Sequence, residues 1–180
     1  MITVISGTNR KDSECLHFAR LYQKLLQSGT GEEVRLLALE AIPHDWFHPE
    51  MYASAGQHES LAQVQDHYIL PAGKMAFILP EYNGSFPGAV KLFIDACSVR
   101  RYADNFKGKK IALLGIASGR AGNLRGMEHM TGIMHYLGAF VLPDKLPISR
   151  IEELMNEQGD ITDEITLSTL RQHAADFLAF

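Results

Sequence analysis

The sequence predicts a doubly wound α/β domain, with five parallel strands in the order 2-1-3-4-5 and helices on both faces of the sheet. Short, almost wholly apolar runs alternate with stretches of helical periodicity, and strands apolar throughout are typical of parallel sheets covered on both sides. The chain has 180 residues, of which 46% are hydrophobic, enough for one ordinary domain with a sizeable core. We therefore expect residues 1–180 to form a single three-layer domain.

Five apolar runs are the expected strands. They cover residues 2–5 (ITVI), 34–39 (VRLLAL), 74–79 (KMAFIL), 110–116 (KIALLGI) and 139–142 (AFVL). Polar or glycine-containing segments bound these runs, as they do strands. Because the runs alternate with helical patterns, we expect them to pair as neighbours in one parallel sheet.

Helical periodicity appears between the strands. The expected helices cover residues 15–26, 61–68, 89–97, 127–137 and 167–178. Asp12 or Ser13 can cap the first of them, Pro87 lies in the first turn of the third, and Gly138 ends the fourth. Residues 40–58 show no period and predict a long surface loop, and a hydrophilic connector precedes the last helix.

Composition excludes several classes of protein. The formal charge of -4 and the pI near 6.0 provide no basic field for a nucleic acid. No apolar run approaches the roughly 20 residues of a membrane span, and the N-terminus lacks a signal-peptide pattern, so we expect a cytoplasmic protein. Cys15 and Cys97 are isolated, and His44 and His48 lie in a proline-containing loop, so we predict neither a disulfide nor a metal site.

Three unusual loops follow the first, third and fourth strands: residues 6–13 (SGTNRKDS), 80–88 (PEYNGSFPG) and 117–123 (ASGRAGN). In this type of sheet, ligands bind beyond the carboxyl ends of the strands, beside the switch between strands one and three. We therefore expect the three loops to converge on one site.

The first loop joins a strand to a helix, where backbone N–H groups and the helix dipole favour an anion. Ser6, Thr8 and Ser13 add neutral donors, and Arg10 adds a planar charged fork. The patterns GxxxxGK[ST] and GxGxxG are absent, which favours one terminal phosphate over a triphosphate. The same residues also suit an ordinary capped turn.

The other two loops suit a flat ligand. Tyr82 can lie against a heterocycle while Asn83 reaches its polar edge, although Tyr82 and Phe86 could instead pack on the core. The small residues of 117–123 let a ring approach the backbone closely, although two glycines near a strand end can simply mark a turn. Together the three loops suit a mononucleotide with a planar ring, and flavin mononucleotide (FMN) fits all three.

The chain resembles the NADPH-dependent FMN reductase family, which has a flavodoxin-like fold and includes quinone, azo-dye and chromate reductases. The most specific part is PEYNGSFPGAVKLFID at residues 80–95. The segment GTNRKDS is similar to the family's phosphate loop, GSxRxxS, and SGRAGN followed by a helix and LGAFVLP is similar to its third segment. Thr8 stands where serine is usual, Ala96-Cys97 replaces a frequent tryptophan, and Arg120 and Asn123 replace frequent glycines.

The resemblance implies the residues of the site. The cofactor-binding residues would be Ser6, Thr8, Asn9, Arg10 and Ser13 in the phosphate loop, Pro80, Glu81, Tyr82 and Asn83 at the ribityl chain and isoalloxazine, and Ser118, Gly119 and Arg120 at the pyrimidine edge. The resemblance also implies a homodimer or homotetramer with the helix after PEYN in the interface.

The reaction implied is transfer of hydride from NADPH (or NADH) through bound FMN to a small acceptor: a flavin, a quinone, an azo compound or a metal oxyanion. Because the cofactor supplies the chemistry, we expect no catalytic side chain and ping-pong kinetics. A non-enzymatic electron carrier like flavodoxin is the alternative, and a regulatory domain without flavin is a third. Strands one and three end at Ser6 and Pro80 with no phosphoacceptor aspartate, which argues against a receiver domain.

Overall fold

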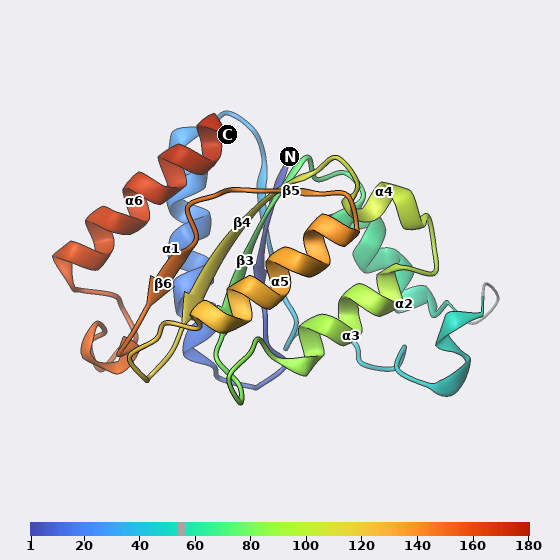
Figure 1. Cartoon of the computed structure of the whole chain (residues 1–180), viewed down its shortest axis with the longest axis horizontal. Helices are drawn as coiled ribbons and strands as arrows, with labels where there is room; N and C mark the ends of the chain where they lie inside the picture. Colours follow the sequence, from blue (N-terminus) through green and yellow to red (C-terminus); the bar gives the residue numbers. More distant parts are fainter. Residues whose placement is uncertain (54–56) are drawn as a thin grey trace.

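A computed structural model of the chain describes residues 1–53 and 57–180. A parallel sheet of order β2-β1-β3-β4-β5, with a sixth strand beside β4, lies between two layers of helices (Figure 1). The strands are β1 (Ile2–Ser6), β2 (Val34–Ala38), β3 (Lys74–Pro80), β4 (Lys110–Ile116), β5 (Phe140–Val141) and β6 (Leu146–Ile148). The predicted flavodoxin-like fold and strand order are confirmed.

The helices are α1 (Glu14–Gly29), α2 (Glu59–Val64), α3 (Gly88–Cys97), α4 (Tyr102–Phe106), α5 (Leu124–Tyr136) and α6 (Glu164–Ala179). Helix α2 continues as a π-helical turn (Gln65–Ile69), and 3-10 turns form at Pro49–Tyr52 and Ile151–Glu153. Two predictions need correction: Pro87 occupies the N-cap position of α3 instead of lying in its first turn, and the loop predicted at 40–58 contains a 3-10 turn. Residues 54–56 of that loop lie outside the described residues.

Strand β3 is the centre of the sheet and sets the position of the three loops. It pairs in parallel with β1, where Ser6 lies opposite Ile78, and with β4, where Pro80 lies opposite Ile116. From Met75 onward every residue of β3 is buried, which accounts for its continuous apolar run. Because the three strands run in the same direction and end within two residues of one another, their loops leave the same edge of the sheet.

The outer neighbour of β4 is divided into two short strands. β5 pairs with the start of β4 and β6 with its end, where Ile148 lies opposite Ile116. The strand predicted at 139–142 is thus only two residues long, and β6 falls in the segment predicted to be a connector. Pro147 lies inside β6, which an edge strand tolerates because one of its sides makes no ladder hydrogen bonds. β6 brings the following residues to the loop edge.

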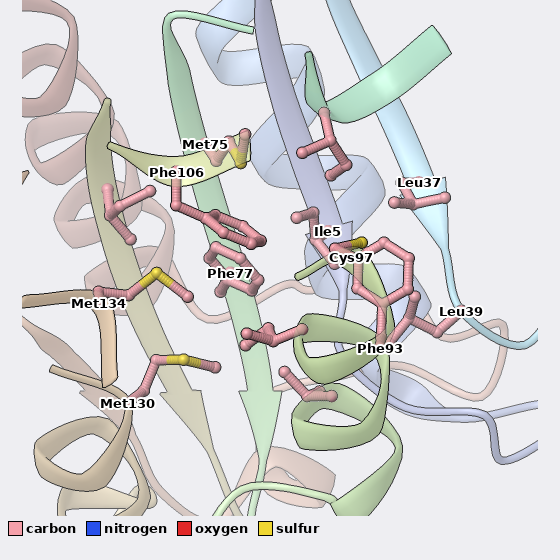
Figure 2. Packing of buried hydrophobic residues seen from close by; sticks show 14 of the residues in the cluster. Ile5, Leu37, Leu39, Met75, Phe77, Phe93, Cys97, Phe106, Met130 and Met134 are labelled. Atoms are coloured by element: carbon pink, nitrogen blue, oxygen red, sulfur yellow. The ribbon is translucent and has the colours of Figure 1, made fainter. Parts of the chain in front are cut away.

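Two apolar layers cover the faces of the sheet. One joins the sheet to α2, α3 and α5, and Figure 2 shows Phe77 of β3, Phe93 of α3 and Met130 of α5 within it. The other joins the sheet to α1 and α6. The two cysteines, Cys15 and Cys97, are free and fully buried, one in each layer.

A buried hydrogen-bond chain fixes α1 against α6. The Nε2–H of His173 donates to the Asp144 carbonyl at 3.1 Å, which leaves Nδ1 to accept the Tyr22 hydroxyl at 2.7 Å. This arrangement uses the neutral imidazole. Burial disfavours the charged ring and lowers the pKa of His173.

The lowered pKa of His173 predicts a pH-dependent stability. The unfolded chain takes up a proton at this histidine near pH 6.5, before the folded chain does. The free energy of unfolding should therefore fall as pH drops below about 6.5, by up to about 1.4 kcal/mol per pH unit, until the folded pKa is passed. Urea denaturation at several pH values measures this slope. It should flatten in His173→Gln but persist in the control His135→Gln, at an exposed histidine; equal slopes in wild type and His173→Gln would contradict the account.

Candidate functional site

A cleft of about 160 Å³ lies at the carboxyl edge of the sheet, where the three predicted loops meet. Its lining comprises Arg10, Ser13, Glu14 and Cys15, then Pro80, Glu81 and Tyr82, then Ile116, Ala117 and Ser118, and finally Ile151 and Glu152. The expected convergence of the loops is therefore present. Ile151 and Glu152, which sequence reasoning missed, reach the cleft because β6 pairs with the end of β4.

The first loop is held tightly against β3. The backbone N–H of Gly7 donates to the Ile78 carbonyl at 2.9 Å, and a Cβ at Gly7 would lie 2.7 Å from that oxygen, so only glycine allows this approach. The Ser6 hydroxyl donates to the Cys15 sulfur, which in turn donates to the Ile78 carbonyl, each at 3.3 Å. Ser6 therefore lies beneath the loop and anchors it.

Thr8 and Ser13 also bind within the protein. Thr8 is fully buried, and its Oγ1 accepts the Arg10 N–H at 3.1 Å and lies 3.0 Å from the Tyr82 hydroxyl. Ser13 is the N-cap of α1, and its Oγ accepts the Cys15 N–H at 3.3 Å. The hydroxyls predicted as phosphate donors thus shape the loop, and only Ser13 among them lines the cleft.

The donors that remain free suit an anion. Within residues 1–53 and 57–180, no protein acceptor takes the backbone N–H groups of Lys11, Asp12 and Ser13. Asp12 adopts a left-handed conformation (φ 55°), a component of the anion-binding backbone turns called nests. The 16-residue helix α1 begins directly afterwards and points its positive end at the same place.

Arg10 can add a charged fork to these donors. Its side chain is exposed and lines the cleft. The arginine ion pairs found in the described part of the chain belong to Arg35, Arg100, Arg101 and Arg150. Arg10 is therefore available to bind a phosphate in a bidentate manner. We call Arg10 and the backbone N–H groups of residues 11–13 the anion cradle.

The second loop is a rigid two-residue turn. The Tyr82 N–H donates to the Ser85 carbonyl at 2.9 Å and the Ser85 N–H donates back at 3.1 Å. Asn83 and Gly84 between them have φ of 53° and 78°, as a type I′ turn requires, and the dipeptide Asn-Gly is the sequence signal for this turn. The turn presents Tyr82 at the cleft, and the Tyr82–Thr8 contact joins it to the first loop.

The third loop is fixed by the segment after β6. The Arg150 N–H donates to the Gly119 carbonyl at 3.1 Å, and the Ile151 N–H donates to the Ala117 carbonyl at 3.2 Å. A Cβ at Gly122 would lie 2.7 Å from the Ile148 nitrogen, so this glycine is required by close packing. The exposed backbone of residues 118–120 is thereby held in place beside the cleft.

Asn123 has a structural role. It is buried, adopts φ of 57° and caps α5 through its Oδ1, which accepts the Gly126 N–H at 3.2 Å. Its Nδ2 donates to the carbonyls of Leu79 and Pro80 at 2.9 and 3.2 Å. Asparagine tolerates the left-handed conformation, which explains how it can stand where glycine is frequent in the resembled family.

The cleft contains carboxylates as well as Arg10. Glu14, Glu81 and Glu152 line it, but all three are exposed, so solvent and salt screen their charge. Cys15 also lines the cleft, yet burial raises the pKa of its thiol to about 12, so it supplies no thiolate nucleophile near neutral pH. These groups provide no catalytic acid, base or nucleophile of obvious function.

The remaining predicted residues lie around the cleft without lining it. Asn83, Gly119 and Arg120 are exposed beside it, and Asn9 projects from the first loop into a different pocket.

An anion cradle, an aromatic turn and an open backbone segment at one edge of a doubly wound sheet define a mononucleotide-binding α/β protein. These residues fit FMN, because its single phosphate matches the cradle and the Tyr82 side chain at the cleft can lie against its ring.

The chain belongs to the NADPH-dependent FMN reductase family, whose sequence profile matches residues 1–153. It is 28% identical to an NAD(P)H-dependent FMN reductase of Pseudomonas aeruginosa, over 93% of this chain and 88% of that one. It is 25% identical to a 2-hydroxy-1,4-benzoquinone reductase of Burkholderia, over 99% and 94%. The predicted family and enzyme class are confirmed, with FMN as cofactor and NAD(P)H as reductant.

Solved structures agree with this assignment. The flavoenzyme NAD(P)H:(acceptor) oxidoreductase FerB of Paracoccus denitrificans superposes with a TM-score of 0.77 at 28% identity, covering 99% of this chain and 94% of that one. An archaeal flavodoxin, at 13% identity and a TM-score of 0.62 over 99% and 97%, shares the fold alone.

Replacing Arg10 tests the anion cradle. Arg10→Ala should weaken FMN binding by about 1.5–3 kcal/mol, because a hydrogen bond between two charged groups is lost. That corresponds to a roughly 10- to 150-fold larger Kd. Titration of the apoprotein with FMN, followed by flavin fluorescence, measures the change. The control Arg20→Ala, at an exposed position of α1, should leave the Kd unaltered; an unchanged Kd in Arg10→Ala would refute the role of Arg10.

Proposed function

We propose that this chain, acting as one domain over residues 1–180, is an FMN-dependent oxidoreductase that carries hydride equivalents from NAD(P)H to a small acceptor. Bound FMN would supply the redox chemistry, accepting a hydride from the nicotinamide and then reducing the acceptor. The observation that carries this proposal is the anion cradle beside the Tyr82 turn, joined through the Thr8–Tyr82 contact of 3.0 Å.

The proposed roles of the residues follow from their positions. Arg10, Ser13 and the backbone of residues 11–13 hold the phosphate, while Tyr82 and Asn83 lie along the ribityl chain and the ring. The backbone of residues 118–120 and the Arg120 guanidinium, both exposed beside the cleft, stabilise negative charge at the pyrimidine edge of the reduced ring. No side chain needs to act as acid or base, so reductant and acceptor can use one site in turn, with ping-pong kinetics.

The acceptor proposed is a small organic molecule. The relatives that support this are named as reductases of FMN and of 2-hydroxy-1,4-benzoquinone. An electron carrier remains the alternative from a different class, and direct turnover of NAD(P)H separates the two.

We further propose a cytoplasmic enzyme; in the described residues, no helix has both the length and the apolar character to cross a membrane.

We also propose a homodimer or homotetramer. Large apolar side chains are exposed on and after α5: the relative accessibility of Tyr136 is 84%, of Phe140 60% and of Leu124 52%. Contact with another chain would cover apolar side chains of this size. Together with α3, the helix that the family resemblance assigns to the interface, these residues supply a candidate surface for association.

The function is tested by anaerobic addition of NADPH to the FMN-loaded protein. The visible flavin absorbance should bleach at a rate that depends on NADPH concentration, and a quinone added afterwards should restore it. Protein that binds FMN but is not reduced by either NADPH or NADH would favour the carrier, and protein that binds no FMN would refute the proposed function.

A further inference from the structure

The segment that follows β6 forms one wall of the cleft. At its start, the Ile151 N–H donates to the Ala117 carbonyl of the third loop at 3.2 Å. Further along, Gly159 packs against the ring of His17 on α1, where a Cβ at Gly159 would lie 2.4 Å from the ring. The segment is thus attached to the third loop at one end and to the helix that follows the anion cradle at the other. We call residues 150–159 the connector wall.

Glu152 is the charged residue of the connector wall that lines the cleft. The 3-10 turn at this point fixes its position, because Ile151 is buried on one side of it and Glu153 lies 3.6 Å from the Arg150 guanidinium on the other. The Glu152 side chain is exposed, and it makes no hydrogen bond or ion pair within the part of the chain that the structure describes. Its carboxylate is therefore available to a ligand in the cleft.

The backbone carbonyls at the ends of β3 and β4 are already in use. Each accepts a hydrogen bond from another part of the protein; they are the carbonyls of Ile78, Leu79, Pro80, Ile116 and Ala117. A ligand hydroxyl that enters the cleft gives up hydrogen bonds to water, which costs free energy unless it finds a new acceptor. The strongest acceptors left at the cleft are the carboxylates of Glu14, Glu81 and Glu152.

These three carboxylates lie at different places around the cleft. Glu14 is the first residue of α1, directly after the anion cradle, where a bound phosphate would repel it. Glu81 follows β3, and the family resemblance already assigns it to the flavin. Glu152 comes from beyond β6, on the other side of β4. Because the connector wall runs from the third loop to α1, Glu152 borders the space between the backbone of residues 118–120 and the anion cradle.

We propose that Glu152 accepts hydrogen bonds from the hydroxyl groups of the ribityl chain, and so selects a flavin that carries this chain over a bare isoalloxazine. This role rests on the proposed function, in which the phosphate occupies the anion cradle and the ring lies beside Tyr82 and residues 118–120, so that the ribityl chain spans the cleft between them. A carboxylate has two oxygens and can accept from two neighbouring hydroxyls at once. Glu152 is a binding residue and takes no part in hydride transfer.

Glu152 has opposite effects on two parts of FMN. Its hydrogen bonds stabilise the bound ribityl chain, whereas its negative charge repels the phosphate in the anion cradle, to an extent that solvent and salt reduce. Riboflavin, which has the ribityl chain without the phosphate, isolates the first effect. Lumiflavin, which has neither, reports on the ring alone.

Titration of the apoprotein with the three flavins, followed by flavin fluorescence, tests this role. In Glu152→Ala the riboflavin Kd should rise roughly 5- to 20-fold, near the low end for a hydrogen bond to a charged group because solvent reaches this side chain. The lumiflavin Kd should stay within about twofold, since no hydrogen bond to the ring is removed. The FMN Kd should rise less than that of riboflavin, because the repulsion of the phosphate is removed as well.

Two variants serve as controls. Glu152→Gln keeps an acceptor oxygen without the charge, so its riboflavin Kd should stay within roughly threefold of wild type. Glu153→Ala removes the same charge from the same turn, at a residue outside the lining of the cleft, and should alter none of the three Kd values. Circular dichroism checks that each variant folds.

The outcomes separate this proposal from the proposed function. Equal rises in the riboflavin and lumiflavin Kd values of Glu152→Ala would show that Glu152 acts on the ring or on the fold, and the proposal would be wrong. It would also be wrong if riboflavin binding were unchanged while FMN bound more tightly, because Glu152 would then only repel the phosphate. Riboflavin binding that depends on Glu152, in a protein that NAD(P)H does not reduce, would support this role and refute the oxidoreductase. Reduction of bound FMN without any dependence of flavin binding on Glu152 would do the reverse.

Discussion

The pairing of β3 with β1 and β4 is the constraint on which the rest of the structure depends. β3 is buried on both faces and hydrogen-bonded along both sides, so its end fixes the place where three loops leave the sheet. Asn123 extends this constraint past the end of the strand, because its amide binds the carbonyls of Leu79 and Pro80. The three loops are therefore set by the sheet, and the candidate site is largely formed before any ligand binds.

Side chains and backbone have separate tasks at the cleft. The buried hydroxyls of Ser6 and Thr8 shape the first loop, and the left-handed residues Asn83 and Asn123 shape the other two. The groups left free are backbone N–H groups, Arg10 and the Tyr82 ring. Such groups suit the binding and orientation of a cofactor that itself supplies the chemistry, as expected for a member of a flavin reductase family.

The sequence predicted the central strands well because a strand buried on both faces must be apolar along its whole length. It missed β6, which is three residues long with a proline at its middle, and α4, whose Asn105 accepts a hydrogen bond from Gln65, 40 residues away in the chain. Asn105 of α4 donates to the carbonyls of Cys97, Arg100 and Arg101, and no local pattern predicts that network. For the same reason Ile151 and Glu152 could not be assigned to the cleft: only strand pairing brings them there. The motif residues were located correctly at the edge, but their inward or outward orientation depends on packing.

The central claim is that three loops at one edge of the sheet form the flavin site. The most direct measurement is the change in backbone amide chemical shifts when FMN is titrated into isotope-labelled apoprotein. The account predicts the largest changes at residues 8–13, 81–84 and 118–120, with small changes at residues 42–47. Changes concentrated in residues 42–47 and the first half of α3, with residues 8–13 unaffected, would contradict it.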